Sequence, residues 1–319
     1  MPGRATEEPR APETAVDGVL VVDKPRGLTS HDVVARARRL LGTRRVGHVG
    51  TLDPLATGVL PLVVGRATRL AALLASGPKT YAAVIRLGVV TDTYDATGTV
   101  APAAARDPVP AAALDRAQIE AAGRAFTGTF RQQPPPFSAK KVRGVRAYRL
   151  ARRQQPVELR AVEVTVHSFE ILALRDAELQ CRVRCAPGFY MRSLAHDLGR
   201  ALGCGACLQS LRREGSGAFT LDQAVTLDAL VGEAAAPARH LVALAELLPE
   251  LPAVVVTDRG AERTAHGNLL RAADVRAAAG QPPVPPAAAR VKVYDAAGTL
   301  LAIAEPAPGG ALHPRIVLV

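Results

Sequence analysis

The segment with the clearest capacity for chemistry is the glycine-rich loop 47–58, which contains His48, Asp53 and Pro54. Its three glycines allow close approach of a ligand and left-handed backbone conformations. Pro54 favours an extended backbone at Asp53, which restricts the direction of the carboxylate. A carboxylate fixed in this way can act as a nucleophile or a general base. Taken alone, an Asp-Pro in a glycine-rich loop is more often an ordinary turn, and a lone loop histidine is more often structural or solvated.

The four cysteines have a spacing that superficially resembles a zinc site, Cys181-x3-Cys185 and Cys204-x2-Cys207. However, polar and apolar residues alternate around Cys181 and Cys185, which is typical of a strand. Residues i and i+4 of a strand lie about 13 Å apart. Two thiolates at that separation cannot both bind one zinc ion at about 2.3 Å. The sequence therefore predicts no metal site, and so few cysteines favour a reducing, cytoplasmic location.

Other catalytic motifs are incomplete. Gly42 and Gly47 have the glycine spacing of a phosphate-binding loop, but His48 and Val49 follow where Lys and Ser or Thr are required. The seven histidines form no H-E-x-x-H pair, and there is no G-x-S-x-G motif. These gaps disfavour kinases, zinc proteases and serine hydrolases.

The charge balance favours a polyanionic partner. Forty Lys and Arg residues against 29 Asp and Glu give a net charge of +11, and such proteins displace counterions from nucleic-acid phosphates. A generally arginine-rich composition is the alternative explanation. No segment approaches the about 18 apolar residues of a membrane helix. Residues 1–17 are polar and predict a disordered tail rather than a signal peptide.

The complete loop, GHVGTLDPLATGVLP, strongly resembles the catalytic motif of the tRNA pseudouridine synthases of the TruB type, which isomerise the T-loop uridine at position 55. Further segments resemble flanking motifs of that family in the same order: VLVVDKPRGLTSHDVV, KTYAAVIRLGVVTDTYDATG, RQQPPPFSAKKVRGVRAY, and GFYMRSLAHDLG with LGCGACLQSLRR. The resemblance covers residues 18 to about 232, and the remainder is similar to a PUA-like domain.

The resemblance implies three catalytic residues. Asp53 matches the catalytic aspartate, and Arg192 matches the arginine that pairs with it. Tyr81 matches the tyrosine that stacks on the target base, where its hydroxyl is also placed for acid–base catalysis. From its strand pattern alone, Tyr81 would be interpreted as a core residue.

Four further residues match positions that contact or support the substrate. His48 matches a histidine that engages the flipped RNA, and Tyr190 and Leu211 match residues that line the uracil pocket. Asp95 falls where the family has a second polar partner of the arginine. The resemblance therefore implies a substrate site built from segments far apart in the sequence.

Three positions depart from the family pattern. Val49 and Phe137 stand where Thr and Tyr are common, and Arg149 stands where an acidic residue often occurs. None of them is the expected nucleophile. Phe137 and Arg149 belong to the expected RNA-gripping insertion, where they change the side chains that face RNA.

The implied reaction breaks the N1–C1′ bond of uridine and joins C5 to C1′. It is redox-neutral and adds no group, so no cofactor or metal is expected. The target base must leave its stack, which costs a few kcal/mol. A tRNA T-arm is the expected partner, with no membrane, no required protein partner and a monomeric state.

Two other functions stay open. A non-catalytic protein that binds or folds tRNA would have no need of a carboxylate such as Asp53 with its arginine. A guide-RNA-dependent pseudouridine synthase is disfavoured by the long Arg- and Pro-rich segment 128–160, which a stand-alone enzyme needs to grip tRNA.

The elements that must position these residues follow from hydrophobic spacing. A strand is expected at 18–22, a helix after the N-cap Thr29 with Gly42 following its end, and a second helix over 66–75. Alternation predicts a strand at 79–88 with Tyr81 facing inward. Paired strands are expected at 161–174 and 177–186, with a helix from Met191.

These elements predict an α+β protein with a mixed, largely antiparallel sheet flanked by helices, the pseudouridine synthase fold. Residues 18–250 are expected to form the catalytic domain, with 128–160 as its RNA-gripping insertion. Residues 251–319 contain four short apolar segments and are expected to form a small β-rich, PUA-like domain.

Overall fold

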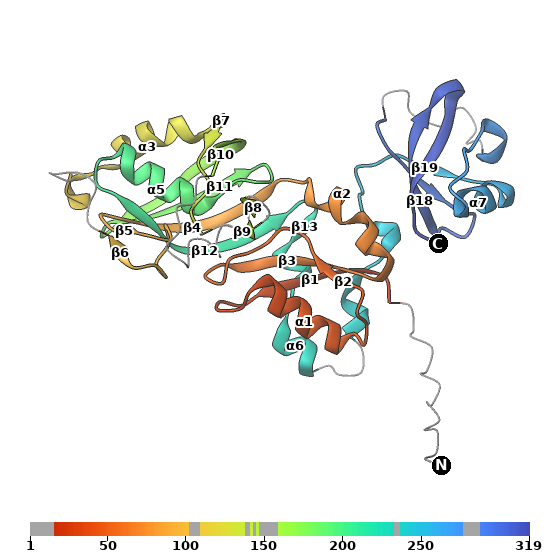
Figure 1. Cartoon of the computed structure of the whole chain (residues 1–319), viewed down its shortest axis with the longest axis horizontal. Coiled ribbons are helices and arrows are strands. Elements are labelled where there is room, and N and C mark those ends of the chain that lie inside the picture. Colours follow the sequence, from red (N-terminus) through yellow and green to blue (C-terminus); the bar gives the residue numbers. More distant parts are fainter. Residues whose placement is uncertain are drawn as a thin grey trace, which may run out of the picture.

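The structure is a computed structural model that describes residues 16–101, 109–137, 141–142, 145–146, 159–232, 237–276 and 288–319. Figure 1 shows a large body that contains the long strands and a smaller lobe formed by the C-terminal residues. The helices are α1 (Ser30–Leu40), α2 (Ala71–Ala75), α3 (Arg116–Gly123), α5 (Met191–Ala201), α6 (Leu227–Gly232) and α7 (Asp258–Ala265).

The body is organised around one 11-stranded mixed sheet whose central path runs β14-β1-β3-β12-β4-β11-β10-β7. Its strands are β1 (Gly18–Lys24), β2 (Val46–His48), β3 (Thr57–Val64), β4 (Lys79–Leu87), β7 (Gly128–Gln132), β10 (Val162–Arg175), β11 (Glu178–Cys185), β12 (Ala206–Ser216), β13 (Phe219–Thr220), β14 (Val225–Thr226) and β15 (Leu241–Val242). Two short hairpins accompany it, β5 (Val90–Thr91) with β6 (Val100–Ala101), and β8 (Lys141–Val142) with β9 (Val145–Arg146).

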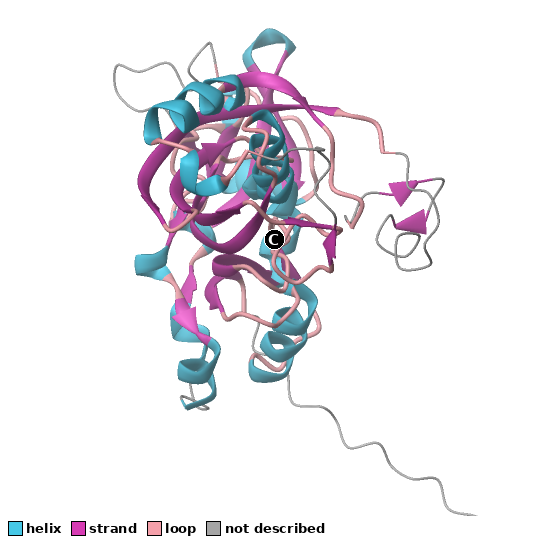
Figure 2. Ribbon diagram, turned by 90° about the vertical axis from the view of Figure 1, so that its left-hand side faces the viewer, coloured by secondary structure: helices cyan, strands magenta, loops and turns pink. Residues whose placement is uncertain are grey.

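Helices cover the two halves of this sheet separately. Helices α1 and α6 lie together beside β1, whereas α3 and α5 lie together over β4, β10 and β12 (Figure 1). Figure 2 shows the curvature of the strands and the helices that lie against them.

Strand β4 follows the predicted alternation. Tyr81, Ala83, Ile85 and Leu87 are all buried, whereas the residues between them are partly or fully exposed. Fully burying such a side chain stabilises the fold by about 1.5–3 kcal/mol. The inward orientation predicted for Tyr81 is confirmed.

Helix α1 begins and ends at the predicted signals. Thr29 forms a capping box with Asp32, in which each side chain accepts a hydrogen bond from the other residue's backbone N–H. Gly42 follows the C-cap with a φ of +63°, a conformation that glycine adopts without strain. The buried face presents Val33, Val34 and Ala37 to the sheet.

Two expectations need correction. The helix expected over 66–75 is a 3₁₀ turn at Gly65–Leu70 followed by the short α2, and the hydroxyl of Thr68 donates to the Gly65 carbonyl within that turn. The first residues of the expected surface insertion, 128–132, form β7, which pairs with β10 at the edge of the main sheet. Much of the remaining insertion, including Arg149, lies outside the described residues.

The C-terminal lobe is a four-stranded sheet of β16 (Ala253–Val255), β17 (Val291–Tyr294), β18 (Leu300–Ala307) and β19 (Ala311–Val317), with α7 beside it. These are the four segments expected as strands, and they are confirmed. The lobe shares a core with the body, in which Ile303 and Leu318 pack with Leu70 and Leu247. Arg66 Nη1 also donates to the Leu318 carbonyl at 2.9 Å.

The expected N-terminal tail falls mainly on residues 1–15, which lie outside the described residues. Its last residue, Asp17, is held in place, because its carboxylate accepts hydrogen bonds from the backbone N–H of Arg66 at 2.6 Å and from Arg66 Nε at 2.7 Å. Among the described residues, the helices are too short or too polar to span a membrane.

Candidate active site

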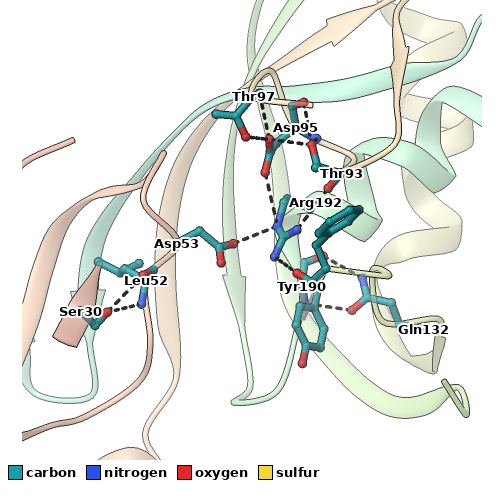
Figure 3. A network of polar contacts seen from close by, with 10 residues as sticks. Ser30, Leu52, Asp53, Thr93, Asp95, Thr97, Gln132, Tyr190 and Arg192 are labelled. Atoms are coloured by element: carbon teal, nitrogen blue, oxygen red, sulfur yellow. Dashed lines mark hydrogen bonds and ion pairs between the residues drawn. The ribbon is translucent and has the colours of Figure 1, made fainter. Parts of the chain in front are cut away.

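Asp53 lies in the loop between β2 and β3, held from behind by the start of α1. The buried Ser30 hydroxyl accepts from the Leu52 N–H at 2.9 Å and donates to the Leu52 carbonyl at 3.1 Å (Figure 3). The Gly27 N–H donates to the Pro54 carbonyl at 2.8 Å. The residues on both sides of Asp53 are therefore anchored, and the side chain projects from a fixed backbone.

Arg192 meets Asp53 from the opposite side. It lies in the first turn of α5, and its Nε donates to Asp53 Oδ2 at 2.9 Å. The arginine side chain is only 6% exposed, whereas the aspartate side chain is 43% exposed. The pair thus places a solvent-accessible carboxylate oxygen beside a buried cation, and the pairing is the one that the family resemblance implies.

The guanidinium of Arg192 is fixed by every one of its nitrogens. Nη1 donates to the Thr93 carbonyl at 3.1 Å and Nη2 to the Phe137 carbonyl at 2.9 Å, while Nε also lies 3.7 Å from Asp95 Oδ2. Such a planar, multiply bonded guanidinium has little freedom to rotate. Phe137 contributes its backbone carbonyl, so the departure from Tyr does not alter this contact.

Asp95 occupies the position predicted for a second partner of Arg192. Its Oδ1 accepts from the hydroxyl of Thr93 at 2.9 Å and from the N–H and hydroxyl of Thr97 at 2.9 Å and 2.5 Å (Figure 3). The residue is buried behind Arg192. Its carboxylate can therefore support the arginine but does not line the cavity described next.

A cavity of about 320 Å³ opens beside the Asp53–Arg192 pair. Its walls bring together five of the seven residues singled out in the sequence: Asp53, Tyr81, Tyr190, Arg192 and Leu211. They come from the β2–β3 loop, β4, the start of α5 and β12. The cavity is thus the place at which the two halves of the sheet and their helices meet.

Tyr190 is positioned through its backbone by Gln132, the last residue of β7. The Gln132 side chain accepts from the Tyr190 N–H at 2.9 Å and donates to its carbonyl at 3.0 Å (Figure 3). The Ser193 hydroxyl donates to the Gln133 carbonyl at 2.7 Å. The base of the insertion therefore fixes the N-terminus of α5, and with it Arg192.

His48 lies outside the cavity lining, at the end of β2. Its ring packs edge-on against His31, with ring centroids 5.3 Å apart. Burial lowers the pKa of His48, and His31 and Arg213 lower it further. Its Nδ1 is buried without a hydrogen-bond partner among the described residues. The predicted contact of His48 with RNA stays a prediction.

Two cationic residues of the cavity wall were missed in the sequence, Lys79 and Arg213. Burial lowers the pKa of Lys79 to about 8, and its Nζ donates to the Ala75 carbonyl at 2.8 Å and to the Gly77 carbonyl. Side chains of a strand alternate between its two faces, and this alternation could have placed both residues on the cavity side. Lys79 shares the face of Tyr81, and Arg213 shares the face of Leu211.

The cysteines are unpaired and buried, and Cys181 and Cys185 lie on the single strand β11 as predicted. Burial raises the pKa of both thiols to about 12. In the part of the chain that the structure describes, no cluster of three or more His, Cys, Asp or Glu side chains could hold a metal ion.

The chain matches two family models. Residues 38–191 match the TruB family pseudouridylate synthase (N terminal domain), and residues 192–251 match the tRNA pseudouridylate synthase B C-terminal domain. The chain is 45% identical over 305 residues to the tRNA pseudouridine synthase B of Solibacter usitatus, covering 95% of this chain and 100% of that protein. It is 49% identical over 263 residues to that of Thermobifida fusca, covering 80% and 86%.

Solved structures confirm the predicted fold. A chain of an H/ACA RNP bound to a substrate RNA containing 2′-deoxyuridine superposes with a TM-score of 0.69 at 25% identity, covering 97% of this chain and 88% of that one. A chain of the archaeal box H/ACA sRNP Nop10–Cbf5 complex gives 0.68 at 26% identity, covering 97% and 89%. From these matches, the chain belongs to the TruB family of pseudouridylate synthases.

Proposed function

We propose that this protein isomerises uridine to pseudouridine in the T loop of tRNA, at position 55, with Asp53 as the catalytic carboxylate. The observation that carries the proposal is the Asp53–Arg192 pair at 2.9 Å on the wall of a cavity. The relatives named tRNA pseudouridine synthase B, which are 42–52% identical to this chain, support tRNA as the substrate.

The cavity suits a single extruded base. Its volume of about 320 Å³ is at the lower end of the range of about 300–1,000 Å³ typical of small-molecule sites. Leu211 and Tyr190 supply its apolar and aromatic walls, and the ring of Tyr81 offers a stacking surface. A base held there would have its glycosidic bond close to the exposed oxygen of Asp53.

The protein's own groups divide the chemistry between them. Asp53 either attacks the nucleoside or assists removal of a proton, and Arg192 orients it and compensates its charge. The Tyr81 hydroxyl is the second group in the cavity that can exchange a proton. Asp95 supports Arg192 from behind, and His48 is proposed to contact the flipped RNA outside the cavity. The reaction needs no cofactor or metal.

Binding of the T-arm is proposed to use the net charge of +11. Residues 18–250 would form the catalytic domain and 251–319 a PUA-like domain that contacts phosphates. We further propose a cytoplasmic monomer that needs no protein partner. The sequence identity of this chain to the solved structures from H/ACA complexes is about half its identity to the tRNA enzymes. This difference favours a stand-alone enzyme over a guide-dependent one.

The decisive experiment combines a deletion with a purified system. Pseudouridine would be mapped in bulk tRNA from cells lacking this chain, and the full-length protein would then be incubated with an unmodified T-arm transcript and no guide RNA. We expect pseudouridine to be absent from the T-loop site in these cells, and we expect the purified protein to form it in the transcript. A T-loop site that stays fully modified in the deletion strain would contradict the assignment.

A further inference from the structure

Arg213 is a buried cation in the cavity wall to which the proposed mechanism gives no task. It lies on β12 and is 1% exposed, making it one of the largest fully buried side chains of the described residues. Its Nε donates to the Val59 carbonyl at 2.7 Å and its Nη2 to the Gly50 carbonyl at 3.0 Å. These bonds tie the strand to the loop that carries Asp53.

Two glycines of that loop pack closely against Arg213, Gly50 against its side chain and Gly58 against its main chain. A Cβ atom at Gly50, which has a φ of +73°, would lie 3.2 Å from Arg213 Nη1. A Cβ atom at Gly58 would lie 2.2 Å from the Arg213 carbonyl oxygen, which no side chain can tolerate. The loop and the arginine are therefore packed as one unit.

The charge of Arg213 has no carboxylate partner within 4.0 Å among the described residues. Burying a guanidinium without a counter-ion costs several kcal/mol, which main-chain carbonyls offset only in part. A methionine or leucine would fill the same volume at lower cost. A buried charge with such a free-energy cost is typical of a group whose charge is needed at a functional site.

The guanidinium faces the hydroxyl of Tyr81. The two residues are directly opposite each other on β12 and β4, on the buried face of the sheet, and both line the cavity. Arginine has no acceptor, so in a hydrogen bond between these two side chains the guanidinium is the donor and the Tyr81 oxygen the acceptor. A phenol oxygen that accepts from Arg213 keeps its own hydrogen pointed away from the guanidinium.

We propose that Arg213 is the positioning residue for Tyr81, directing the phenol hydrogen into the cavity toward an acceptor atom of the pyrimidine base. This inference rests on the proposed function, because it assigns the cavity to a base. The cation also stabilises negative charge on the phenol oxygen. Burial raises the pKa of Tyr81, Asp53 and Cys185 raise it further, and Arg213 opposes this rise.

The test compares Arg213→Gln in two backgrounds. Single-turnover tritium release from C5-labelled uridine is measured with full-length enzyme in excess over a T-arm transcript. In the wild-type background we expect a loss of about a hundredfold, the scale for one preorganised donor. In the Tyr81→Phe background we expect less than about a threefold further loss, because coupled residues are not additive. An equal loss in both backgrounds would overturn the proposal.

The matched control is the neighbouring arginine. Arg212 precedes Arg213 on the same strand but pairs with Asp23 at 2.7 Å on the other face of the sheet. Arg212→Gln removes the same charge without touching the cavity, and we expect its turnover to stay within about twofold of wild type, as for most surface changes. A hundredfold loss in this control would equally overturn a specific role for Arg213.

A second measurement does not depend on activity or on the folding of Arg213→Gln. A fluorinated tyrosine with a more acidic phenol is placed at position 81, and its titration is followed by fluorine NMR in the wild type and in Arg213→Lys. The lysine keeps the charge, but its single nitrogen cannot reach the Val59 carbonyl, the Gly50 carbonyl and the phenol oxygen together as the planar guanidinium does, so the phenol should titrate at higher pH. An unchanged titration would refute the contact. If the wild-type protein modified no uridine, the proposed function would be wrong. The titration would still test the contact between Arg213 and Tyr81, because it does not depend on turnover.

Discussion

The cavity has two walls, each with a buried arginine that donates to main-chain carbonyls, but only one of the two arginines has acidic partners. Arg192 donates to the carbonyls of Thr93 and Phe137 and also faces the carboxylates of Asp53 and Asp95. Arg213 faces main-chain carbonyls and the phenol of Tyr81 and is positioned by the backbone. The first wall is thus able to carry a reactive anion, and the second to orient a neutral group.

The two walls also differ in how their contacts respond to change. Breaking an ion pair leaves a buried charge without compensation, which is a large and local effect. Losing the contact between Arg213 and the phenol leaves no unpaired charge behind, but the Tyr81 hydroxyl is then free to turn. Substitutions on the first wall should therefore affect the chemical step, whereas those on the second should act through Tyr81.

The largest effect is expected from removing the anion of the first wall. Asp53→Asn preserves the shape of the side chain but removes its charge and its nucleophilicity, so turnover should be abolished. The affinity for RNA should stay within about threefold of the wild-type value, because removing a group that acts only in the transition state leaves ground-state binding intact. Tritium release and filter binding with the same transcript measure the two quantities. Activity above a few per cent of wild type would remove Asp53 from its proposed role.

The next effect sharpens the role of the second wall. Tyr81→Phe keeps the ring but loses the hydroxyl, and turnover should fall by about 10²–10⁴-fold, the range for general acid–base groups. Tyr81→Leu should also lose affinity, because stacking contributes about 1–3 kcal/mol. A Phe variant that works nearly as well as wild type would leave stacking as the only role. A sharply lowered melting temperature would support a core role instead.

A smaller effect is expected from Arg192→Lys. Lysine retains the positive charge but cannot bond Asp53, the Thr93 carbonyl and the Phe137 carbonyl in one plane. The rate of the chemical step should fall by about 10²-fold, as for loss of one oriented donor, with little change in RNA binding. Rapid-quench kinetics separates the two. A wild-type rate would mean that the geometry of the pair is incidental.

Much of the first wall was predictable from the sequence. The spacing of Gly, Asp and Pro in the loop indicated a carboxylate held in a fixed direction. The sequence alone could not place Asp53 beside Arg192, which lies 139 residues away. That contact depends on the tertiary packing of α5 against the loop, and only the family resemblance anticipated it.

The second wall was predictable only in part. Arg212 and Arg213 are adjacent and chemically identical, yet one is partly exposed and the other is buried. Strand β12 has register shifts on both sides of this pair, between Leu208 and Ser210 and between Arg213 and Gly215, which interrupt the alternation along the strand. An arginine in a strand is also normally assigned to the exposed face. The space beside Gly50 that the guanidinium occupies exists only in the folded chain.

The smallest effect concerns the support of the first wall. Ser30 binds both backbone groups of Leu52 and touches neither the cavity nor Asp53 itself. In Ser30→Ala the buried Leu52 N–H loses its only acceptor recorded among the described residues, which should cost about 1–3 kcal/mol of stability. Because the loop keeps the Gly27–Pro54 bond, turnover at saturating RNA should fall only about threefold to tenfold, the scale of a lost neutral hydrogen bond. Ser30→Thr retains the hydroxyl and should restore both quantities, measured by thermal unfolding and tritium release.

Loss of stability with unchanged turnover would show that Pro54 alone fixes the carboxylate. A fall in turnover comparable to that of Asp53→Asn would instead make Ser30 as important to the first wall as the ion pair.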